Sequence, residues 1–324
     1  MASSTQLQAP PVSRPTHRLR EEAGKTGGPP PRRPPLLEPA TLTAIHPLLA
    51  HIVEEITDWD FPDGDVARVL TTRALPSPAP YLIVQYRAPM RTDRYFGSAG
   101  YPLQRYYHVA TVVRTGVVKL GAIGPVGALL IRLKPEASSR LIGEPMQEFF
   151  DAKIDLRNIF NADAVSLLEE MLREAPDSAA RFARIESFLL QNLRQCHPDP
   201  VVCRAAECLR RNPALRMRRL AAQLEVSERH LLRGFRAMFG TGPKQFARLA
   251  RIERIQVMRQ GGSAWADIAY ACGFADQAHM INDFEAIVGE PPQQIFGPCP
   301  VNPDRDGSAS AGPDFFGRYL YGIR

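Results

Sequence analysis

The chain has 324 residues, of which 44% are hydrophobic, and a formal net charge of +6 at pH 7. This length fits about two domains, and the hydrophobic fraction is high enough for buried cores, so most of the chain should be globular. The pI of about 9.2 is compatible with a polyanionic partner.

The cysteines and the apolar stretches bear on the compartment. Five cysteines form no CxxC pair and no metal-ligand spacing with the seven histidines. We therefore expect reduced thiols in a cytoplasmic protein, without a metal or another cofactor. Residues 1–40 lack the apolar run of a signal peptide. The longest apolar stretch, Leu120–Ile131, is interrupted by Gly124 and Pro125 and is too short to span a bilayer, so we expect no membrane partner.

Two terminal segments differ in composition from the rest of the chain. Residues 1–40 contain nine prolines, three glycines and six Lys or Arg, which predicts a disordered leader. Its composition favours a solubilising role, with non-specific DNA contact as the alternative. Residues 297–324 are again rich in Gly, Pro, Ser and Asp and are predicted to be a flexible tail. The segments between them, 41–195 and 201–296, are predicted to be two domains.

Residues 41–195 are predicted to form a β-rich domain with flanking helices. Apolar spacing over 46–57 predicts a helix with Pro47 in its first turn. Short β-rich runs cut by Gly and Pro then predict a small antiparallel barrel or sandwich. Residues 161–195 return to helical periodicity, as two helices separated by Pro176-Asp177-Ser178. The predicted strand runs cover residues 66–72, 81–86, 106–114 and 127–133.

Residues 220–296 contain one motif twice. Matching residues of the two copies are 48 positions apart before the turn that separates the two helices of each motif, and 49 positions apart after it. The turn of the second copy therefore has one extra residue. Each copy has the pattern of a helix-turn-helix: a short helix, a tight turn, a polar N-cap and a second helix. The tandem suggests a DNA reader with two recognition helices. The first copy comprises Leu220-Ala221, Leu224, Ser227, His230-Leu231, Phe235, Gly240 and Pro243, and the second Ile268-Ala269, Cys272, Asp276, His279-Met280, Phe284, Gly289 and Pro292.

The apolar positions of the repeats are candidate core, and a long helix over about 243–260 is expected to join the copies. The fold class is therefore α+β, a barrel-like N-terminal domain followed by an all-α domain. The buried side of the joining helix is predicted to comprise Phe246, Leu249, Ile252, Val257 and Met258. The core is predicted to comprise Leu220, Ala221, Leu224, Leu231, Phe235 and Phe239 in the first copy, and Ile268, Ala269, Cys272, Phe274, Met280 and Phe284 in the second.

The outward positions of the second helix in each copy are the candidate DNA readers. Arg229, Arg233 and Arg236 recur at i, i+4 and i+7 with His230 beside them, and arginine can pair bidentately with guanine. The alternative is a solvated basic face, which the helix-turn-helix context disfavours. The matching places of the second copy hold weaker readers: Ala278, Asn282 and Glu285, with Gln277 and His279 nearby.

The charge is distributed unevenly between the copies. Residues 201–260 carry 14 Lys or Arg against four Asp or Glu, whereas residues 261–296 carry no Lys or Arg and five Asp or Glu. The first copy and the joining helix are therefore expected to supply most of the attraction for DNA, and the second copy to bind DNA less tightly or to contact protein. The predicted phosphate contacts are Arg216, Arg218, Arg236, Lys244, Arg248 and Arg251.

The two repeats resemble the DNA-binding domain of AraC/XylS-type transcription regulators. The resemblance covers about 100 residues. It implies a seven-helix domain whose two recognition helices enter adjacent major-groove segments on one face of the DNA. Leu232 and Asn282-Asp283 depart from the family pattern. The likeness is strongest at Asp267-Ile268-Ala269, Cys272-Gly273-Phe274, Asp276-Gln277-Ala278-His279-Met280, Gly289, Pro292 and Phe296. The resemblance together with the helix positions predicts base contacts by Arg229, His230, Arg233, Gln277, Ala278, His279 and Asn282.

The N-terminal region resembles, more loosely, the sensor domains that precede this module in one branch of the family. The likeness lies in residues 127–135, 141–145 and 155–156. It implies a cupin-like domain that senses a small-molecule effector or forms a homodimer. The predicted partner of the whole chain is double-stranded DNA, with RNA polymerase as a further candidate.

Two other functions are open to this sequence. The β-rich domain could be an enzyme or a small-molecule-binding barrel with the helical part as an interaction module, although no nucleophile elbow, phosphate loop or metal cluster supports an enzyme. DNA-alkyl repair, which joins the same module to a zinc-bound cysteine, would need cysteines that residues 1–195 lack. The other of the two functions, besides an enzyme or a small-molecule-binding barrel, is protein interaction by the acidic second copy, which is compatible with DNA binding by the first.

Overall fold

The structure is a computed structural model. It describes residues 39–64, 67, 71–96, 99–100, 104–106, 108–112, 115–143, 146–149, 152–196 and 198–296. The chain divides into two compact parts, residues 1–37 and 38–324, and every described residue belongs to the second part. The predicted flexible tail and all but the last two residues of the predicted leader lie outside the described residues.

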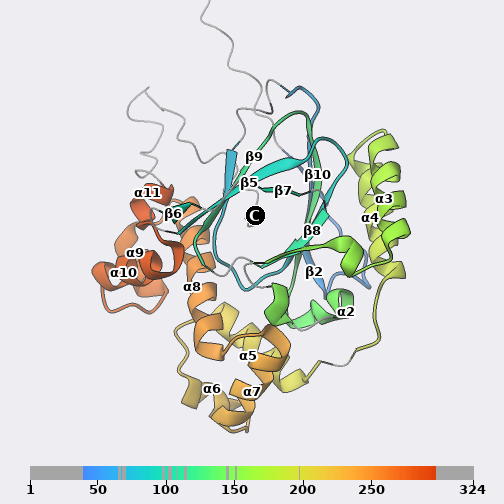
Figure 1. Ribbon diagram of the computed structural model, residues 1–324. Coiled ribbons are helices and arrows are strands. Elements are labelled where there is room, and N and C mark those ends of the chain that lie inside the picture. Colours follow the sequence, from blue (N-terminus) through green and yellow to red (C-terminus); the bar gives the residue numbers. More distant parts are fainter. Residues whose placement is uncertain are drawn as a thin grey trace, which may run out of the picture. The chain divides into compact units, whose positions relative to one another are not determined.

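The N-terminal half of the described chain is built on two antiparallel sheets, which confirms the expected β-rich region (Figure 1). Among the described strands, pairing joins neither sheet into a closed barrel. The first sheet has the order β1 (Ala40–Thr41), β2 (Val53–Phe61), β10 (Val126–Leu133), β4 (Tyr81–Gln85), β8 (His108–Thr111) and β11 (Lys153–Asp155). The second has the order β3 (Thr71–Ala74), β9 (Val117–Gly121), β5 (Met90–Phe96) and β6 (Ala99–Gly100), with β7 (Gln104–Tyr106) also paired to β5.

The helix predicted over residues 46–57 is wrong. Only hydrogen-bonded turns are formed up to Ile52, and Val53 begins strand β2. Strand β2 pairs with β1 on one side and β10 on the other, with Ile56 opposite Ile131. Most of its residues are buried, so its apolar residues do not alternate as in a half-exposed strand. Pairing to distant strands therefore outweighs a local spacing that also fits a helix.

The other predicted strands differ in how well they match. The runs at 81–86 and 127–133 match β4 and β10, and the run at 106–114 contains β8. The run at 66–72 reaches β3 only at its last two residues, and most of it lies outside the described residues. Strands β5 and β9 were not predicted.

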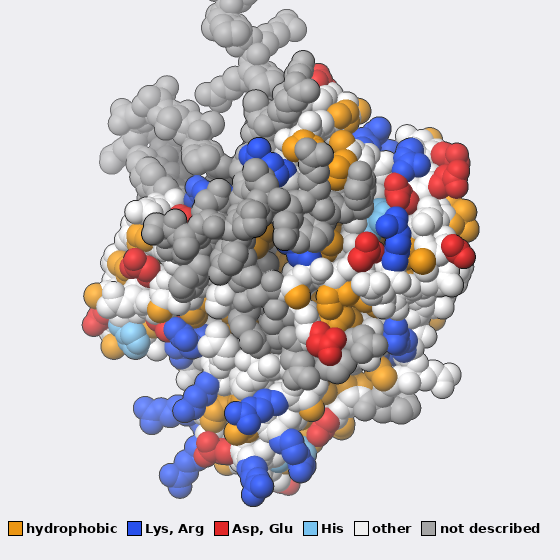
Figure 2. Space-filling model, viewed as in Figure 1, with side chains coloured by type: hydrophobic (Ala, Val, Ile, Leu, Met, Phe, Trp, Pro, Cys, Tyr) orange, Lys and Arg blue, Asp and Glu red, His pale blue; other side chains and the backbone are white. Residues whose placement is uncertain are grey.

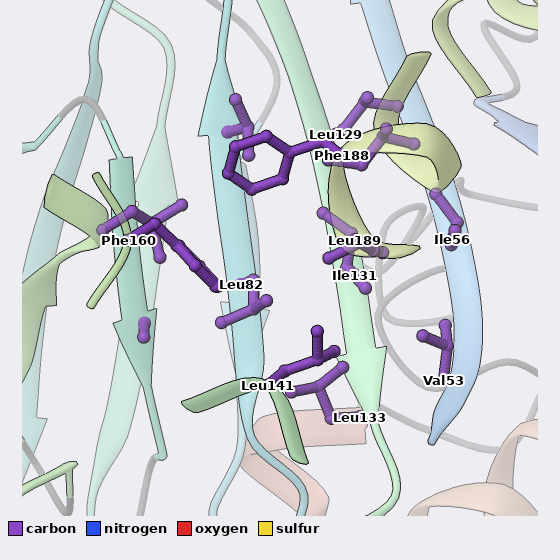
Figure 3. Packing of buried hydrophobic residues seen from close by; sticks show 14 of the residues in the cluster. Val53, Ile56, Leu82, Leu129, Ile131, Leu133, Leu141, Phe160, Phe188 and Leu189 are labelled. Carbon is purple, nitrogen blue, oxygen red and sulfur yellow. The ribbon is translucent and has the colours of Figure 1, made fainter. Parts of the chain in front are cut away.

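A large apolar core lies between the first sheet and two helices, α3 (Ala162–Glu174) and α4 (Ser178–Gln191). These are the two helices expected over 161–195, and the Asp177 carboxylate caps α4 by accepting from the Ala180 N–H at 2.8 Å. Side chains from β2, β4, β10 and α4 point toward one another in this core (Figure 3). Burying each large aliphatic side chain contributes roughly 1.5–3 kcal/mol, so this core ties the helices to the sheet.

Buried charged groups also link α4 to strand β2 of the first sheet. Arg181 of α4 donates to Asp58 of β2 at 2.9 Å and lies 2.8 Å from Asp60. The Tyr86 hydroxyl donates to Asp58 at 2.5 Å, and the Arg181 guanidinium lies over the Tyr86 ring. Burial and the neighbouring Asp58 carboxylate raise the pKa of Tyr86, so its hydroxyl remains a donor.

Short helical segments follow β10 and flank β11. They are η1 (Pro135–Ala137), α2 (Ser139–Ile142), η2 (Met146–Phe149) and η3 (Leu156–Asn158).

The C-terminal region, fully described from Pro198 onward to Phe296, has the seven helices implied by the resemblance. Helices α6 and α7 form the first helix-turn-helix, called here the first unit. Helices α9 and α10 form the second one, the second unit, and α8 joins the two (Figure 1). No helix in the described part of the chain is both long and apolar enough to cross a membrane. The helices are α5 (Pro200–Arg211), α6 (Met217–Gln223), α7 (Glu228–Phe239), α8 (Pro243–Gln260), α9 (Trp265–Ala271), α10 (Gln277–Val288) and α11 (Pro292–Phe296).

Helix α8 matches the predicted joining helix, but its buried side differs in detail. Phe246, Leu249 and Ile252 are buried as expected, whereas Val257 is 38% exposed and Ile255 is fully buried. Continuing the 3.6-residue period from Ile252 leads to Ile255 and Arg259 rather than Val257.

Residues of the N-terminal half contact helices α5, α8 and α11 of the C-terminal region. The buried Glu253 of α8 accepts hydrogen bonds from Ser77 and from Arg132 of β10. Arg210 of α5 donates to both carboxylate oxygens of Glu54 at 2.8 Å. Burial would raise the pKa of Glu54, but the Arg132 and Arg210 guanidiniums outweigh it and hold that pKa below its usual value. At α11, Arg73 of β3 donates to the backbone carbonyl of Gln294 at 3.1 Å.

Candidate nucleic-acid interface

The local geometry of the first unit follows from three residues around α7. The Ser227 hydroxyl accepts from the His230 N–H at 3.1 Å and caps the helix. The turn before it contains Glu225 with φ of 56°, and Gly240 ends the helix with φ of 62°. The predicted N-cap and C-terminal glycine are thus where a helix-turn-helix needs them.

The inner face of α7 is packed tightly against its supports. A Cβ on Gly234 would lie 2.3 Å from Val202 of α5, so the glycine allows the close approach of the two helices. Phe235, Phe239 and Phe246 pack together with ring centroids 4.9–5.3 Å apart. This support fixes which face of α7 points outward. The predicted core residues of this copy are buried, except that Leu224 is half-buried at the edge of the cluster.

The outer face of α7 is a row of arginines. Arg229, Arg233 and Arg236 are all exposed, and none of them forms an ion pair with another described residue. His230 is different, because it is half-buried and its Nε2 lies 3.2 Å from the Asp199 carboxylate. The three guanidiniums are therefore available to a ligand, whereas His230 has a partner within the chain.

Further cations surround this row. Arg216 and Arg218, at the start of α6, and Lys244, at the start of α8, are exposed. Arg219 is also exposed, although the sequence did not single it out. On the face drawn in Figure 2, Lys and Arg side chains gather over the end of the molecule formed by α5, α6 and α7. A surface of this kind attracts polyanions.

The second unit repeats the local geometry with other residues. The Asp276 carboxylate accepts from the His279 N–H at 2.7 Å and caps α10, and Gly289 ends the helix with φ of 85°. Gly273, with φ of 74°, stands where the first unit has Glu225. All six predicted core residues are buried. Burial raises the pKa of the Cys272 thiol to about 11.

The outer face of α10 carries no cation. Gln277, Ala278, His279 and Asn282 are exposed, as is Glu285 at the position that matches Arg236. The His279 ring lies edge-on to Phe274, with centroids 5.3 Å apart. The predicted readers of the second unit are accessible, but they present amides and an imidazole rather than arginines.

Two of the predicted phosphate contacts lie in intramolecular interactions. Arg248 of α8 is half-buried, with its Nε 3.0 Å and its Nη2 2.8 Å from Oδ1 of Asp283 on α10. Arg251 is also half-buried, with its guanidinium 5.1 Å from the centroid of the Phe274 ring. The three phosphate contacts predicted on α8 therefore differ: Lys244 is exposed, whereas Arg248 and Arg251 contact the second unit. The sequence contains no signal for these pairings, because α8 and α10 meet only in the folded chain.

No group of three or more His, Cys, Asp and Glu side chains in the described part of the chain is arranged to hold a metal ion.

Comparison with known proteins identifies this region. A sequence family described as a helix-turn-helix domain matches residues 220–297. A protein of Streptomyces lividans named as an AraC-like transcription regulator is 34% identical over 97 residues, which are 29% of this chain and 32% of that protein. The matched segment thus spans about a third of the length of this curated relative. The C-terminal region is a helix-turn-helix domain of the AraC type.

Solved structures give weaker likenesses. A variant of ToxT from Vibrio cholerae in its apo form has a TM-score of 0.41 at 11% identity, covering 75% of this chain and 96% of ToxT. Wild-type ToxT with bound unsaturated fatty acid has a TM-score of 0.38 at 12% identity, covering 74% of this chain and 94% of ToxT. The C-terminal domain of AraT from Geobacillus stearothermophilus has a TM-score of 0.31 at 19% identity, covering 36% of this chain and 100% of that domain.

Proposed function

We propose that this chain is a sequence-specific, DNA-binding transcription regulator of the AraC type. The observation that carries the proposal is the row of exposed arginines on α7, a capped recognition helix that Gly234 and three phenylalanines hold in place. Arginine forms bidentate hydrogen bonds with guanine in the major groove, and a helix-turn-helix presents its second helix to that groove. The AraC-like relative supports the same function.

The two units contribute unequally in this proposal. The first unit reads bases through Arg229 and Arg233, while Arg216, Arg218, Arg236 and Lys244 contact phosphates. The second unit reads a neighbouring groove segment more weakly through Gln277, Ala278, His279 and Asn282. The absence of any Lys or Arg from residues 261–296 supports this order, since phosphate contacts dominate affinity for DNA.

In this proposal, the N-terminal region senses an effector or forms a dimer. Its contacts with the helical region support a regulatory role, because Glu253 on α8 accepts from two residues of the N-terminal half. Arg73 reaches α11 as well. A ligand or partner that moves these N-terminal residues would therefore act on the joining helix α8 and on α11.

Selection of bound sequences from a random DNA pool by the full-length chain tests the proposal. We expect an enriched sequence with a strong segment and a weaker one, separated by about one helical turn of DNA. With six to ten phosphate contacts, affinity for the enriched DNA should fall roughly a thousandfold or more between 50 and 200 mM salt. No enrichment together with a flat salt response would refute DNA reading.

The second unit also supports a protein partner such as RNA polymerase. Its net negative charge suits a basic surface, and Tyr270 on α9 is 87% exposed, as an aromatic anchor for a partner would be. Replacing Tyr270 by Ala should then lower transcription from a bound promoter without lowering affinity for DNA. Equal losses of both would contradict a separate protein contact.

A further inference from the structure

One cation of the joining helix lies against the second recognition helix. Both Nε and Nη2 of Arg248 contact the same Asp283 oxygen, at 3.0 and 2.8 Å. Since residues 261–296 contain no Lys or Arg, the charge that balances Asp283 has to come from outside the second unit. Helix α8 supplies it.

The burial of the pair makes it sensitive to the loss of either partner. The Asp283 side chain is only 17% exposed and that of Arg248 is 36% exposed. The other carboxylate oxygen of Asp283 is buried and accepts no hydrogen bond from any described residue. Without Arg248, a carboxylate that is only 17% exposed would lose its counter-ion, which weakens the packing of α10 against α8.

A second contact holds the beginning of the same helix. Arg251, three residues along α8, lies over the Phe274 ring, and Phe274 packs against His279 in the first turn of α10. Helix α8 thus holds α10 at its first turn and at its middle. The exposed readers Gln277, Ala278 and Asn282 lie between or beside these two points.

We propose that Arg248 is a positioning residue for DNA reading: its pair with Asp283 sets the orientation of α10 relative to α8, and so lets both units engage one duplex. This inference rests on the proposed function, because it concerns how the second unit reaches its groove segment. Two recognition helices read one face of DNA only when their separation and tilt match the helical repeat.

The rival role for Arg248 is direct phosphate contact, as its sequence position suggests. The two roles predict opposite effects of Asp283→Asn. If Arg248 contacts phosphate, this change frees the guanidinium and removes a negative charge near DNA, so affinity rises. If Arg248 positions α10, the same change weakens the brace and affinity falls.

The test uses the full-length chain with Arg248→Ala, Asp283→Asn and the double substitution. The probes are the DNA enriched by the wild-type chain and a shortened version that keeps only the segment bound by the first unit. We expect each single variant to lose roughly tenfold in affinity for the long DNA, about the worth of one good base contact. The double variant should lose no more than either single, because the two residues act as one unit. Affinity for the short DNA should stay within about twofold.

The control is Arg173→Ala on α3, which removes one exposed arginine and its ion pair with Glu169 in the N-terminal half. It should leave both affinities within about twofold. Arg248→Lys should give a smaller loss than Arg248→Ala, because lysine keeps the charge but cannot hold two donors on one oxygen in a fixed geometry.

Hydrogen exchange without DNA separates the brace from DNA binding itself. Amide exchange in residues 277–288 should accelerate in Arg248→Ala and Asp283→Asn, while exchange in residues 228–239 stays the same. Unchanged exchange in α10, or a gain of affinity in Asp283→Asn, would overturn the positioning role. If the wild-type chain enriches no sequence, the proposed function fails, and the exchange data still decide whether the brace exists.

Discussion

The two helix-turn-helix units share their local geometry and differ in the surface they present. Helix α7 exposes Arg229, Arg233 and Arg236, whereas the matching positions of α10 hold Ala278, Asn282 and Glu285. The first unit has its cations on its own recognition helix. The second unit has none, and contacts Arg248 and Arg251 of α8 instead.

This difference separates what a fold requires from what a function requires. Caps, glycine positions and buried apolar residues recur in both units because they hold two helices at a fixed angle. The outward residues carry no such constraint, so they can diverge without loss of the fold. One scaffold can therefore hold a strong reader and a weak one side by side.

The largest expected effect tests the strong reader. Replacing both Arg229 and Arg233 by Ala should lower affinity for the selected DNA on the order of a hundredfold or more, since each good bidentate contact provides roughly 1–3 kcal/mol. Replacing Gln277, His279 and Asn282 together should cost less than tenfold. Arg173→Ala on α3, the loss of one exposed arginine in the N-terminal half, is the control, and binding is measured by fluorescence anisotropy. A larger loss from the second set would reverse the assignment of strong and weak readers.

Substitutions at matching positions in the turns of the two helix-turn-helix units, Glu225 and Gly273, should change the free energy of unfolding in opposite directions. Gly273→Ala places a Cβ at φ of 74° and 2.3 Å from the Ala214 Cβ, and should lower the free energy of unfolding by about 2 kcal/mol or more. Glu225→Gly relieves a left-handed non-glycine residue and should raise it by about 0.5–1 kcal/mol. Urea denaturation measures both. Shifts of the same sign would show that the two turns are not equivalent.

The helix caps offer a matched pair of smaller effects. Ser227→Ala and Asp276→Ala each remove an acceptor for an amide at the first turn, and each should cost about 1 kcal/mol of unfolding free energy. The loss at Asp276 should be the larger, because a carboxylate also interacts with the helix dipole. Ser227→Thr and Asp276→Asn keep an acceptor and serve as controls. Thermal unfolding that is insensitive to the alanine variants would contradict the capping role.

Adding a cation to α10 should narrow the difference in DNA affinity between the two units. Glu285→Lys places a positive charge where the first unit has Arg236, and should raise affinity for random-sequence DNA a few-fold at low salt. The salt dependence should steepen by about 0.9 in log–log slope for one added phosphate contact. Glu170→Lys on α3, an exposed site in the N-terminal half, makes the same charge change as a control. Equal effects of the two would mean that net charge alone matters.

The smallest effect concerns the closed core of the second unit. Because burial raises the pKa of Cys272 to about 11, its thiol should react slowly with iodoacetamide at pH 8, and at an ordinary rate once urea unfolds the chain. Because the folded state holds the thiol proton more tightly, the free energy of unfolding should fall as the pH rises from about 9 to about 11. Mass spectrometry of each cysteine peptide measures the rate. Rapid labelling of Cys272 at pH 8 would contradict a closed core.

By itself the sequence determined the helix-turn-helix tandem, its caps and the arginine row of the first unit. These features depend on neighbours within one or two helical turns. The matching N-caps Ser227 and Asp276 and the matching glycines Gly240 and Gly289 were therefore enough to predict them. The two helices over 161–195 and the strands β4 and β10 were predicted for the same reason, since apolar spacing and turn residues are local.

Only the tertiary structure decided which residues of β2 and α8 meet distant partners. A strand obtains its hydrogen bonds from other strands, and β2 pairs with β10 more than 60 residues away. Its local apolar spacing fits a helix equally well and does not predict this pairing. The side of a helix that faces solvent is likewise set by what packs on it, and this turned Arg248 toward Asp283 and His230 toward Asp199. An arginine counted in a sequence is a charge; whether it contacts DNA or another helix depends on the surfaces that folding brings beside it.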